Sequence, residues 1–411
     1  MQVCIIYDGD YPWDVRIEKM TITLVNNGYD VHLICRNLNK KPIYEMFNEI
    51  HIHRIPARAS NFVNHLSSFP AFFNPLWLAK IRDVIRRFAI DLIVVRDLPL
   101  ALAAVLIGKR YDLPVIFDMA ENYPAMLHDA WKYDDFKLTN LVVRNPTIAK
   151  AVERVALKTV THVITVIEES KARLVRLGVD EARISIVRNT PVIGVQNDEE
   201  AGCVGSEGNV CVAPHRIKLI YVGGLEPMRG LDALIGNMPE LVEEIPQLRL
   251  TIVGGGKWQN GLEAEVNRLG LGPHVTFTGR LPYWEALKRV RQSDAGIIPH
   301  RITPHTTCTI PNKLFEYMMN GVPVIATNMA PVRRIIEDTG CGYIYSNVSE
   351  LAGALNKVAD ENIRKRLGDN ARQATRTQYN WNMDGQSFLR VIELALHKPP
   401  LSRLTVESVA K

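Results

Sequence analysis

Short apolar runs alternate along this chain with longer segments in which apolar side chains recur every three or four residues. Residues 3–7 form such a run, and Ile17, Met20 and Leu24 then follow at helical spacing before Gly28. The run is typical of a buried parallel strand, and the spacing after it predicts a helix that ends at the glycine. The alternation continues, and it predicts further strands at 31–35, 92–95, 115–117, 162–166, 218–222, 248–253, 275–278, 295–299 and 323–327.

This pattern predicts an α/β fold with parallel sheets covered by helices on both faces. Residues 194–216 interrupt it, because they hold four glycines and several acids but no aromatic residue. We therefore expect a linker or insertion there, between an N-terminal domain at 1–193 and a C-terminal domain at 217–377. Residues 378–411 are expected to form a helix that packs back on the N-terminal domain, followed by a tail. Two doubly wound domains of this kind would bind ligands in a cleft, at the carboxyl ends of their strands.

Composition narrows the class of protein. A formal net charge of +5 over 411 residues gives no argument for a nucleic-acid partner. The longest apolar run, at 98–108, is shorter than the roughly 20 residues of a membrane-spanning helix. The cysteines form no CxxC pair, and the chain opens without a basic region before its first apolar run. We therefore expect the thiols to be reduced and the protein to be cytoplasmic. Any contact with the inner face of the membrane is expected to be that of a peripheral protein.

Two basic residues stand near the predicted starts of helices. Arg229 follows the glycine turn at 223–224, and Lys313 follows Pro311, a favourable first-turn residue. A helix N-terminus offers free backbone N–H groups to phosphate, so the two cations predict a diphosphate clamp. Taken alone, Lys313 and Glu316 are also compatible with an exposed i,i+3 ion pair.

The order of fragments in the second half resembles the retaining nucleotide-sugar glycosyltransferases of family 4, which have the GT-B fold. That fold consists of two doubly wound, Rossmann-like domains facing each other across a cleft. The resemblance covers most of the second half and only loosely the first. The matching fragments are 222–225 (VGGL) with 229–230 (RG), 253–256 (VGGG), 277–280 (FTGR), 293–300 (SDAGIIPH), 311–318 (PNKLFEYM) and 321–327 (GVPVIAT).

The resemblance implies a set of donor contacts. Arg229 and Lys313 would hold the donor diphosphate, Glu316 would accept hydrogen bonds from the ribose hydroxyls, and the backbone around Arg280 would face the base. Two departures concern the sugar contact. Gly224 stands where the family often has Arg, and Cys308 stands at a catalytic position where the family often has Glu, although no neighbour in sequence would activate its thiol. The further donor-binding positions are Gly9, Gly223, Gly254, Pro311 and Asn312.

Two loops of the N-terminal half are expected to face the cleft, at 10–16 and 118–124. Asp14 and Glu121 are candidates for charge stabilisation in catalysis, and Arg16 and Asp118 for the acceptor side. Many family members carry a histidine in the second loop, where this chain has Ala120. Asp14 and Arg16 are also compatible with a local helix cap and ion pair.

Residues 51–90 form a basic and aromatic stretch in which Asp83 is the one acid. Aromatic anchors beside cations suit an anionic membrane surface, and therefore a lipid-linked acceptor. The alternative is a helix whose aromatic face is core and whose basic face is solvated. The basic residues are Arg54, Arg58, Lys80, Arg82, Arg86 and Arg87, and the aromatic ones that precede the basic helix are Phe62, Phe69, Phe72, Phe73 and Trp77.

The resemblance therefore implies a retaining glycosyltransferase that uses a nucleotide-diphosphate sugar and a glycan or lipid-linked acceptor. No metal site and no cofactor beyond the donor are expected, because protein cations would neutralise the leaving diphosphate. The alternatives are a sugar-nucleotide epimerase of the same fold and a non-catalytic donor-binding subunit. A nicotinamide-dependent oxidoreductase is disfavoured, because neither glycine cluster has the G-x-G-x-x-G spacing with an acid about 20 residues on.

Overall fold

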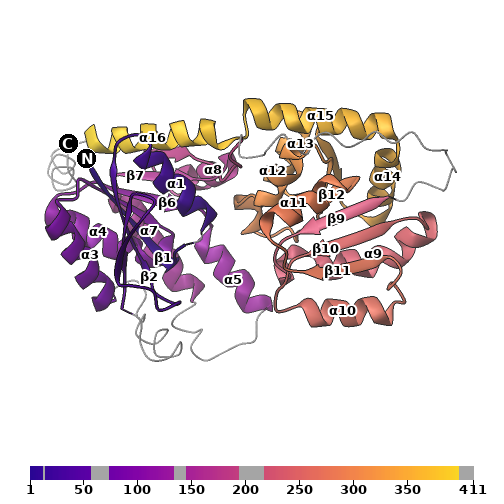
Figure 1. Cartoon of the computed structure of the whole chain (residues 1–411), viewed down its shortest axis with the longest axis horizontal. Coiled ribbons are helices and arrows are strands. Elements are labelled where there is room, and N and C mark those ends of the chain that lie inside the picture. The colour runs from indigo at the N-terminus through magenta and orange to yellow at the C-terminus, as the bar shows by residue number, and fades with distance from the viewer. Residues whose placement is uncertain (13, 57–73, 134–144, 194–216, 398–411) are drawn as a thin grey trace. The chain divides into compact units, whose positions relative to one another are not determined.

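The computed structural model describes residues 1–12, 14–56, 74–133, 145–193 and 217–397. The chain divides into two compact units, Met1–Asn189 with Met383–Lys411, and Thr190–Asn382 (Figure 1). Each unit is built on one sheet with its own hydrophobic core. The predicted linker at 194–216 lies outside the described residues.

The sheet of the first unit has the strand order β3-β4-β2-β1-β5-β6-β7-β8 within the described residues. All neighbouring strands are parallel except β3 and β4, which are antiparallel. The strand predictions of the first half are confirmed, whereas the sequence missed β3, β4 and β8, which lie at or beside the sheet edges. The strands are β1 (Gln2–Asp10), β2 (Asp30–Arg36), β3 (Tyr44–Phe47), β4 (Ile50–Arg54), β5 (Leu92–Arg96), β6 (Val115–Met119), β7 (His162–Thr165) and β8 (Ile184–Ile186).

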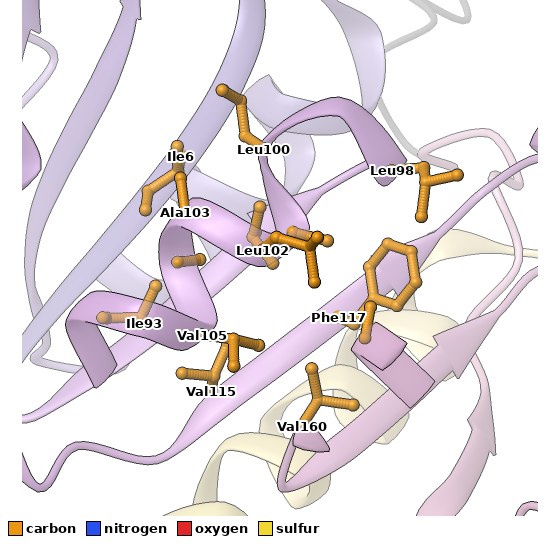
Figure 2. Close-up of a cluster of buried hydrophobic side chains, with 14 of the residues drawn as sticks. Ile6, Ile93, Leu98, Leu100, Leu102, Ala103, Val105, Val115, Phe117 and Val160 are labelled. Atoms are coloured by element: carbon orange, nitrogen blue, oxygen red, sulfur yellow. The ribbon is translucent and has the colours of Figure 1, made fainter. Parts of the chain in front are cut away.

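Helices of the first unit pack an apolar core against this sheet. Figure 2 shows part of the core, in which Ile6, Ile93 and Phe117 of the strands lie among Leu102 and Val105 of α4. Helix α16 belongs to this unit, and the Arg188 backbone N–H donates to Asp384 of α16 at 3.0 Å. The helices are α1 (Val15–Val25), α3 (Pro75–Phe88), α4 (Ala101–Tyr111), α5 (Tyr123–Tyr133), α7 (Pro146–Thr159), α8 (Glu168–Arg176) and α16 (Trp381–His397).

The sheet of the second unit has the order β11-β10-β9-β12-β13-β14, and its strands are all parallel. The strand predictions of the second half are confirmed, and β14 was missed. The strands are β9 (Lys218–Val222), β10 (Arg249–Val253), β11 (Val275–Gly279), β12 (Ala295–Ile298), β13 (Val324–Thr327) and β14 (Gly342–Tyr345). The helices are α9 (Leu231–Glu244), α10 (Gln259–Arg268), α11 (Tyr283–Arg291), α12 (Asn312–Met319), α13 (Ala330–Thr339), α14 (Val348–Ala359) and α15 (Glu361–Thr377).

Each sheet contains one point at which the strand order reverses. Strand β1 lies between β2, which follows it in the chain, and β5, which is reached after several other elements. Strand β9 lies in the same way between β10 and β12. Ligands of open α/β sheets bind outside the carboxyl ends of the strands at such a switch point. The residues that follow β1, β5, β9 and β12 are therefore the first candidates for a binding site.

The basic helix α3 is amphipathic. Its Trp77 is 2% exposed and lies in the core with Ile81 and Val84, while Arg86 and Arg87 lie on its exposed side. For Trp77 the membrane-anchor interpretation is therefore wrong, because burial in the core leaves no surface for a bilayer. The four phenylalanines of the predicted stretch lie outside the described residues. Among the described helices, none is both long and apolar enough to cross a membrane.

Candidate functional site

Glycines at the end of β9 bring two backbone segments into close contact. The Gly223 N–H donates to the Val253 carbonyl at 2.9 Å, and the Gly223 backbone has a φ of 141°. A Cβ added to Gly254, whose φ is 139°, would lie 1.9 Å from the Gly223 carbonyl oxygen. A side chain at either position would be strained, and at Gly254 it would also collide with backbone. The exposed Gly224 follows, so this turn presents backbone rather than side chains.

Arg229 lies in a turn that is fixed on the loop after β12. The turn is the short 3₁₀ segment η5 (Pro227–Arg229), and Gly230, with a φ of 67°, connects it to α9. The Arg301 N–H donates to the Met228 carbonyl at 3.1 Å, and a Cβ on Gly230 would lie 1.9 Å from the Pro299 carbonyl oxygen. Within the described residues, no hydrogen bond or ion pair engages the Arg229 guanidinium. The turn thus holds a half-buried cation ready for an anion.

Lys313 is a buried cation without an anionic partner. It is the second residue of α12 and is 7% exposed, and its Nζ lies 3.6 Å from the centroid of the Tyr221 ring. Within the described residues its Nζ has no hydrogen-bond partner. Burial lowers the pKa of the Lys313 ammonium well below its ordinary value, the charge of Arg229 lowers it further, and Glu316 raises it. The alternative of an exposed Lys313–Glu316 ion pair is therefore wrong, because the ammonium lies inside the protein.

Tyr221 holds this lysine over the glycine turn. The Tyr221 hydroxyl donates to the Gly224 carbonyl at 2.7 Å, which fixes the ring beneath the ammonium. A Cβ on Gly223 would lie 2.9 Å from Nζ, so the missing side chain provides the space that Nζ occupies. Cation–π attraction compensates part of the cost of burying the charge. The arrangement places a cation beside the free backbone of a helix N-terminus, which is a favourable anion site.

His300 is a further member of this cluster, and no role was predicted for it from the sequence. It follows β12, is 2% exposed, and its Nε2 has no partner within the described residues. Burial lowers the pKa of His300 well below its ordinary value, and the charges of Lys313, Arg229 and His305 lower it further. A neutral imidazole can still donate one N–H to a phosphate oxygen. The signal in the sequence was its place after a buried strand beside β9.

The other predicted donor residues lie around the same strand ends. Glu316 is half-buried and stands three residues after Lys313 on α12. The exposed Arg280 follows β11, and its side chain lies 3.3 Å from the position of a Cβ on Gly255. Pro311 is the N-cap of α12, Asn312 is its exposed first residue, and the half-buried Cys308 ends the short turn η6 (Thr306–Cys308). Their contacts with a donor remain predictions.

In the first unit, Arg16 and Asp118 form a buried ion pair. Arg16 Nη2 lies 2.6 Å and Arg16 Nε 2.8 Å from the two carboxylate oxygens of Asp118, and the residues are 1% and 0% exposed. Arg16 Nη1 also donates to the carbonyls of Val187 and Arg188. The pair joins the start of α1 to β6 and to the chain after β8. The prediction that Arg16 and Asp118 contact the acceptor is therefore wrong, because neither side chain is exposed. Their ion pair positions the loops instead.

Asp14 is the N-cap of α1, as the capping alternative predicted. Its Oδ1 accepts from the backbone N–H groups of Arg16 and Ile17, and its Oδ2 accepts from the Tyr7 hydroxyl. Gly9 lies in β1, where a Cβ would collide with the Tyr7 ring at 2.3 Å. Glu121 is half-buried in the loop after β6. The catalytic roles of Asp14 and Glu121 and a donor contact of Gly9 stay predictions.

Comparison with known families identifies the chain. The family described as "Glycosyl transferases group 1" matches residues 212–374, and the "Glycosyl transferase 4-like domain" matches residues 14–190. The chain belongs to the group 1 glycosyltransferases. This glycosyltransferase is 25% identical over 207 residues to an uncharacterized glycosyltransferase of Methanocaldococcus jannaschii, a match of 50% of the chain and 47% of the relative. It is 27% identical over 176 residues to a GDP-mannose-dependent phosphatidylinositol monomannoside mannosyltransferase of Corynebacterium glutamicum. This match covers 41% of the chain and 45% of the relative.

The glycosyltransferase thus spans about half the length of the curated relatives it matches. Solved structures match it over nearly its whole length. Sucrose-phosphate synthase from Thermosynechococcus elongatus matches with a TM-score of 0.75 and 18% identity, over 96% of this chain and 98% of the other. HepE from Anabaena, in complex with UDP and glucose, matches with a TM-score of 0.68 and 14% identity, over 96% and 99%. These likenesses establish the GT-B fold of the glycosyltransferase.

Proposed function

We propose that this glycosyltransferase moves a hexosyl group from a nucleotide-diphosphate sugar to a glycan or lipid-linked acceptor, with retention and without a metal or organic cofactor. The observation that carries the proposal is the buried, unpaired Lys313 ammonium over Tyr221. A buried charge without a partner is costly, and a bound diphosphate would supply the missing counter-charge. Arg229 and the unsatisfied Nε2 of His300 would share the phosphate oxygens with it.

The chemistry assigned to these groups is stabilisation of the leaving diphosphate. As the bond between the anomeric carbon and the phosphate oxygen breaks, negative charge grows on that oxygen, where Lys313 and Arg229 favour it. The acceptor oxygen forms its bond on the same face, and the departing phosphate takes its proton. No protein base is required for this step, and protein cations take the part that a metal plays elsewhere. Glu316, one turn along α12, would accept hydrogen bonds from the ribose hydroxyls.

The compared proteins support the choice of donor and acceptor class. HepE was solved with UDP and glucose, and the Corynebacterium relative is named for GDP-mannose and a phosphatidylinositol mannoside. Both matching families are described as glycosyl transferases, which favours transfer over the epimerase and over the non-catalytic subunit. The exposed arginines of α3 are the observation that supports contact of the basic stretch at 51–90 with an anionic membrane.

The decisive experiment is thermal stability with UDP, GDP, ADP and NAD in the presence of EDTA. We expect one diphosphate to raise the melting temperature, and Arg229→Ala and Lys313→Ala to remove the rise. Lys288→Ala, an exposed lysine of α11, is the matched control and should keep it. A rise with NAD alone, or with none of the four, would contradict the proposal.

The reaction itself is tested with the sugar nucleotide of the base found in this way. The labelled donor is incubated with a membrane lipid extract, and the anomeric configuration of the product is read by NMR. Retention supports the mechanism, and inversion contradicts it. Release of free sugar with no dependence on extract would favour an abortive or epimerase-like reaction instead.

A further inference from the structure

The first unit has polar side chains with unsatisfied hydrogen-bonding atoms at its own switch point. Asp97 follows β5 directly, beside the carboxyl end of β1. Its Oδ1 is buried and has no hydrogen-bond partner within the described residues, and the same holds for Nε and Nη1 of Arg96. The two side chains approach no closer than 3.5 Å, from Arg96 Nε to Asp97 Oδ2, and Arg96 Nη1 lies 3.4 Å from Asp14 Oδ1. Donor and acceptor groups therefore lie together without satisfying each other.

The backbone of Asp97 is held in a conformation that suits glycine. Its φ is 62° and its ψ is 164°, a region that side-chain-bearing residues rarely occupy. The Asp97 N–H donates to the Asp118 carbonyl at 3.0 Å, and the next residues, Leu98 and Leu100, are each 1% exposed in the core (Figure 2). These contacts fix the strained geometry. Aspartate occupies a position whose backbone conformation favours glycine, which indicates a functional role for its carboxylate.

The charges of this site select a class of ligand. The carboxylates of Asp14 and Asp97 flank the one guanidinium of Arg96, while Arg16 and Asp118 neutralise each other nearby. A phosphate would meet two carboxylates and is disfavoured. A neutral sugar fits, because its hydroxyls can donate to Asp97 Oδ1 and accept from the Arg96 guanidinium.

We propose that Asp97 and Arg96 bind hydroxyl groups of a neutral sugar acceptor at the carboxyl ends of β1 and β5. This inference rests on the proposed transferase function and adds the acceptor class and two acceptor-binding residues. The pKa of Asp97 also suits this role. Burial raises the pKa of Asp97 to about 7, Arg96 lowers it, Asp118 and Glu121 raise it, and Arg16 lowers it. The Asp97 carboxylate is therefore fully ionised, and a strong hydrogen-bond acceptor, only above neutral pH.

The test compares acceptor kinetics of the full chain and of Asp97→Asn. The probes are the octyl glycosides of glucose, galactose and mannose, with polyprenyl phosphate as the anionic probe and the donor identified by thermal stability. We expect transfer to a glycoside, and a 10- to 100-fold rise in the acceptor KM of Asp97→Asn, as for loss of a hydrogen bond to a charged group. Donor affinity should be unchanged, and the acidic limb of kcat/KM near pH 7 should disappear.

Two further variants separate binding from folding. Asp97→Gly removes the carboxylate and relieves the backbone strain, so it should lose acceptor binding while remaining at least as stable. Asp112→Asn is the matched control, since Asp112 also has a positive φ, 57°, but is exposed at the end of α4. An unchanged acceptor KM in Asp97→Asn, or transfer to polyprenyl phosphate in place of the glycosides, would overturn this inference alone. A wild-type protein that binds no donor would overturn the proposed function and this inference with it.

Discussion

The two units of this glycosyltransferase share the switch point at the centre of their sheets and differ in the charge that they place there. Strand β5 lies beside β1 as β12 lies beside β9, so Asp97 and His300 follow corresponding strands. Each has one buried atom without a hydrogen-bond partner among the described residues, a carboxylate oxygen in the first unit and an imidazole nitrogen in the second. The second unit adds the cations Lys313 and Arg229 around its histidine, whereas the first places both acids and arginines around Asp97.

The comparison shows that ligand class is decided by a few residues after the strands. The strand order reverses in the same way in both sheets, and the fold does not choose a substrate. Unpaired cations prepare the second unit for a diphosphate. Asp97 and Arg96, which keep atoms without hydrogen-bond partners among the described residues, prepare the first for hydroxyls. The predictions below test whether these unsatisfied groups carry the difference.

The largest effect is expected from Lys313→Met. The variant removes a buried, unpaired charge, so the ligand-free protein should melt at a higher temperature. Its affinity for the preferred nucleoside diphosphate should fall at least about 100-fold, or about 3 kcal/mol, as a charge-assisted contact is lost. Differential scanning fluorimetry and titration calorimetry measure the two opposite effects. A lower melting temperature in the free variant would show that Lys313 is a structural residue instead.

Calorimetry of the same variant also tests the protonation state of Lys313. Its folded pKa is lowered, and a bound diphosphate would raise it again, so binding should take up protons from the buffer at any pH between the pKa values of the free and bound states. The uptake is read from the dependence of the binding enthalpy on the buffer used. It should be absent in Lys313→Met and kept in the exposed control Lys288→Met.

A smaller effect is expected from Gly230→Ala, which disturbs the turn that carries Arg229. Alanine at a φ of 67° with its Cβ 1.9 Å from a backbone oxygen should destabilise the second unit by about 2 kcal/mol. Diphosphate affinity should fall with it, because the turn moves away from the loop after β12. Gly236→Ala is the matched control, since Gly236 lies within α9 with no atom within 4 Å of an added Cβ. That control should stabilise α9 slightly, because alanine favours a helix. Urea unfolding of both variants tells the two effects apart.

The sequence predicted the sheets well because buried parallel strands are continuous apolar runs, and it located Arg229 and Lys313 because both follow turns at predicted helix starts. It could not show that Lys313 is buried, since burial depends on Tyr221 and Gly223, which are distant in sequence. Arg16 and Asp118 were taken for acceptor contacts because loops after strands usually face a ligand. Their ion pair joins residues 102 apart and could not be read from either loop. Asp97 was missed because its strain and its unsatisfied oxygen exist only in three dimensions.

The smallest effect is expected from Asp97→Asn on stability, and its direction depends on pH. The pKa of Asp97 is about 7 in the folded protein against an ordinary value of 3.8. Between pH 3.8 and about 7 the folded state binds more protons than the unfolded state. The free energy of unfolding therefore falls as the pH rises to about 7, and the loss stays constant above that pH. Asparagine removes this cost but also removes the negative charge beside Arg96, so Asp97→Asn should be more stable than wild type at pH 8 by only about 1 kcal/mol. At pH 4 the two proteins should melt together. A variant that is less stable at pH 8 would mean that the Asp97 charge supports the fold, and the contrast between the two switch points would then rest on the second unit alone.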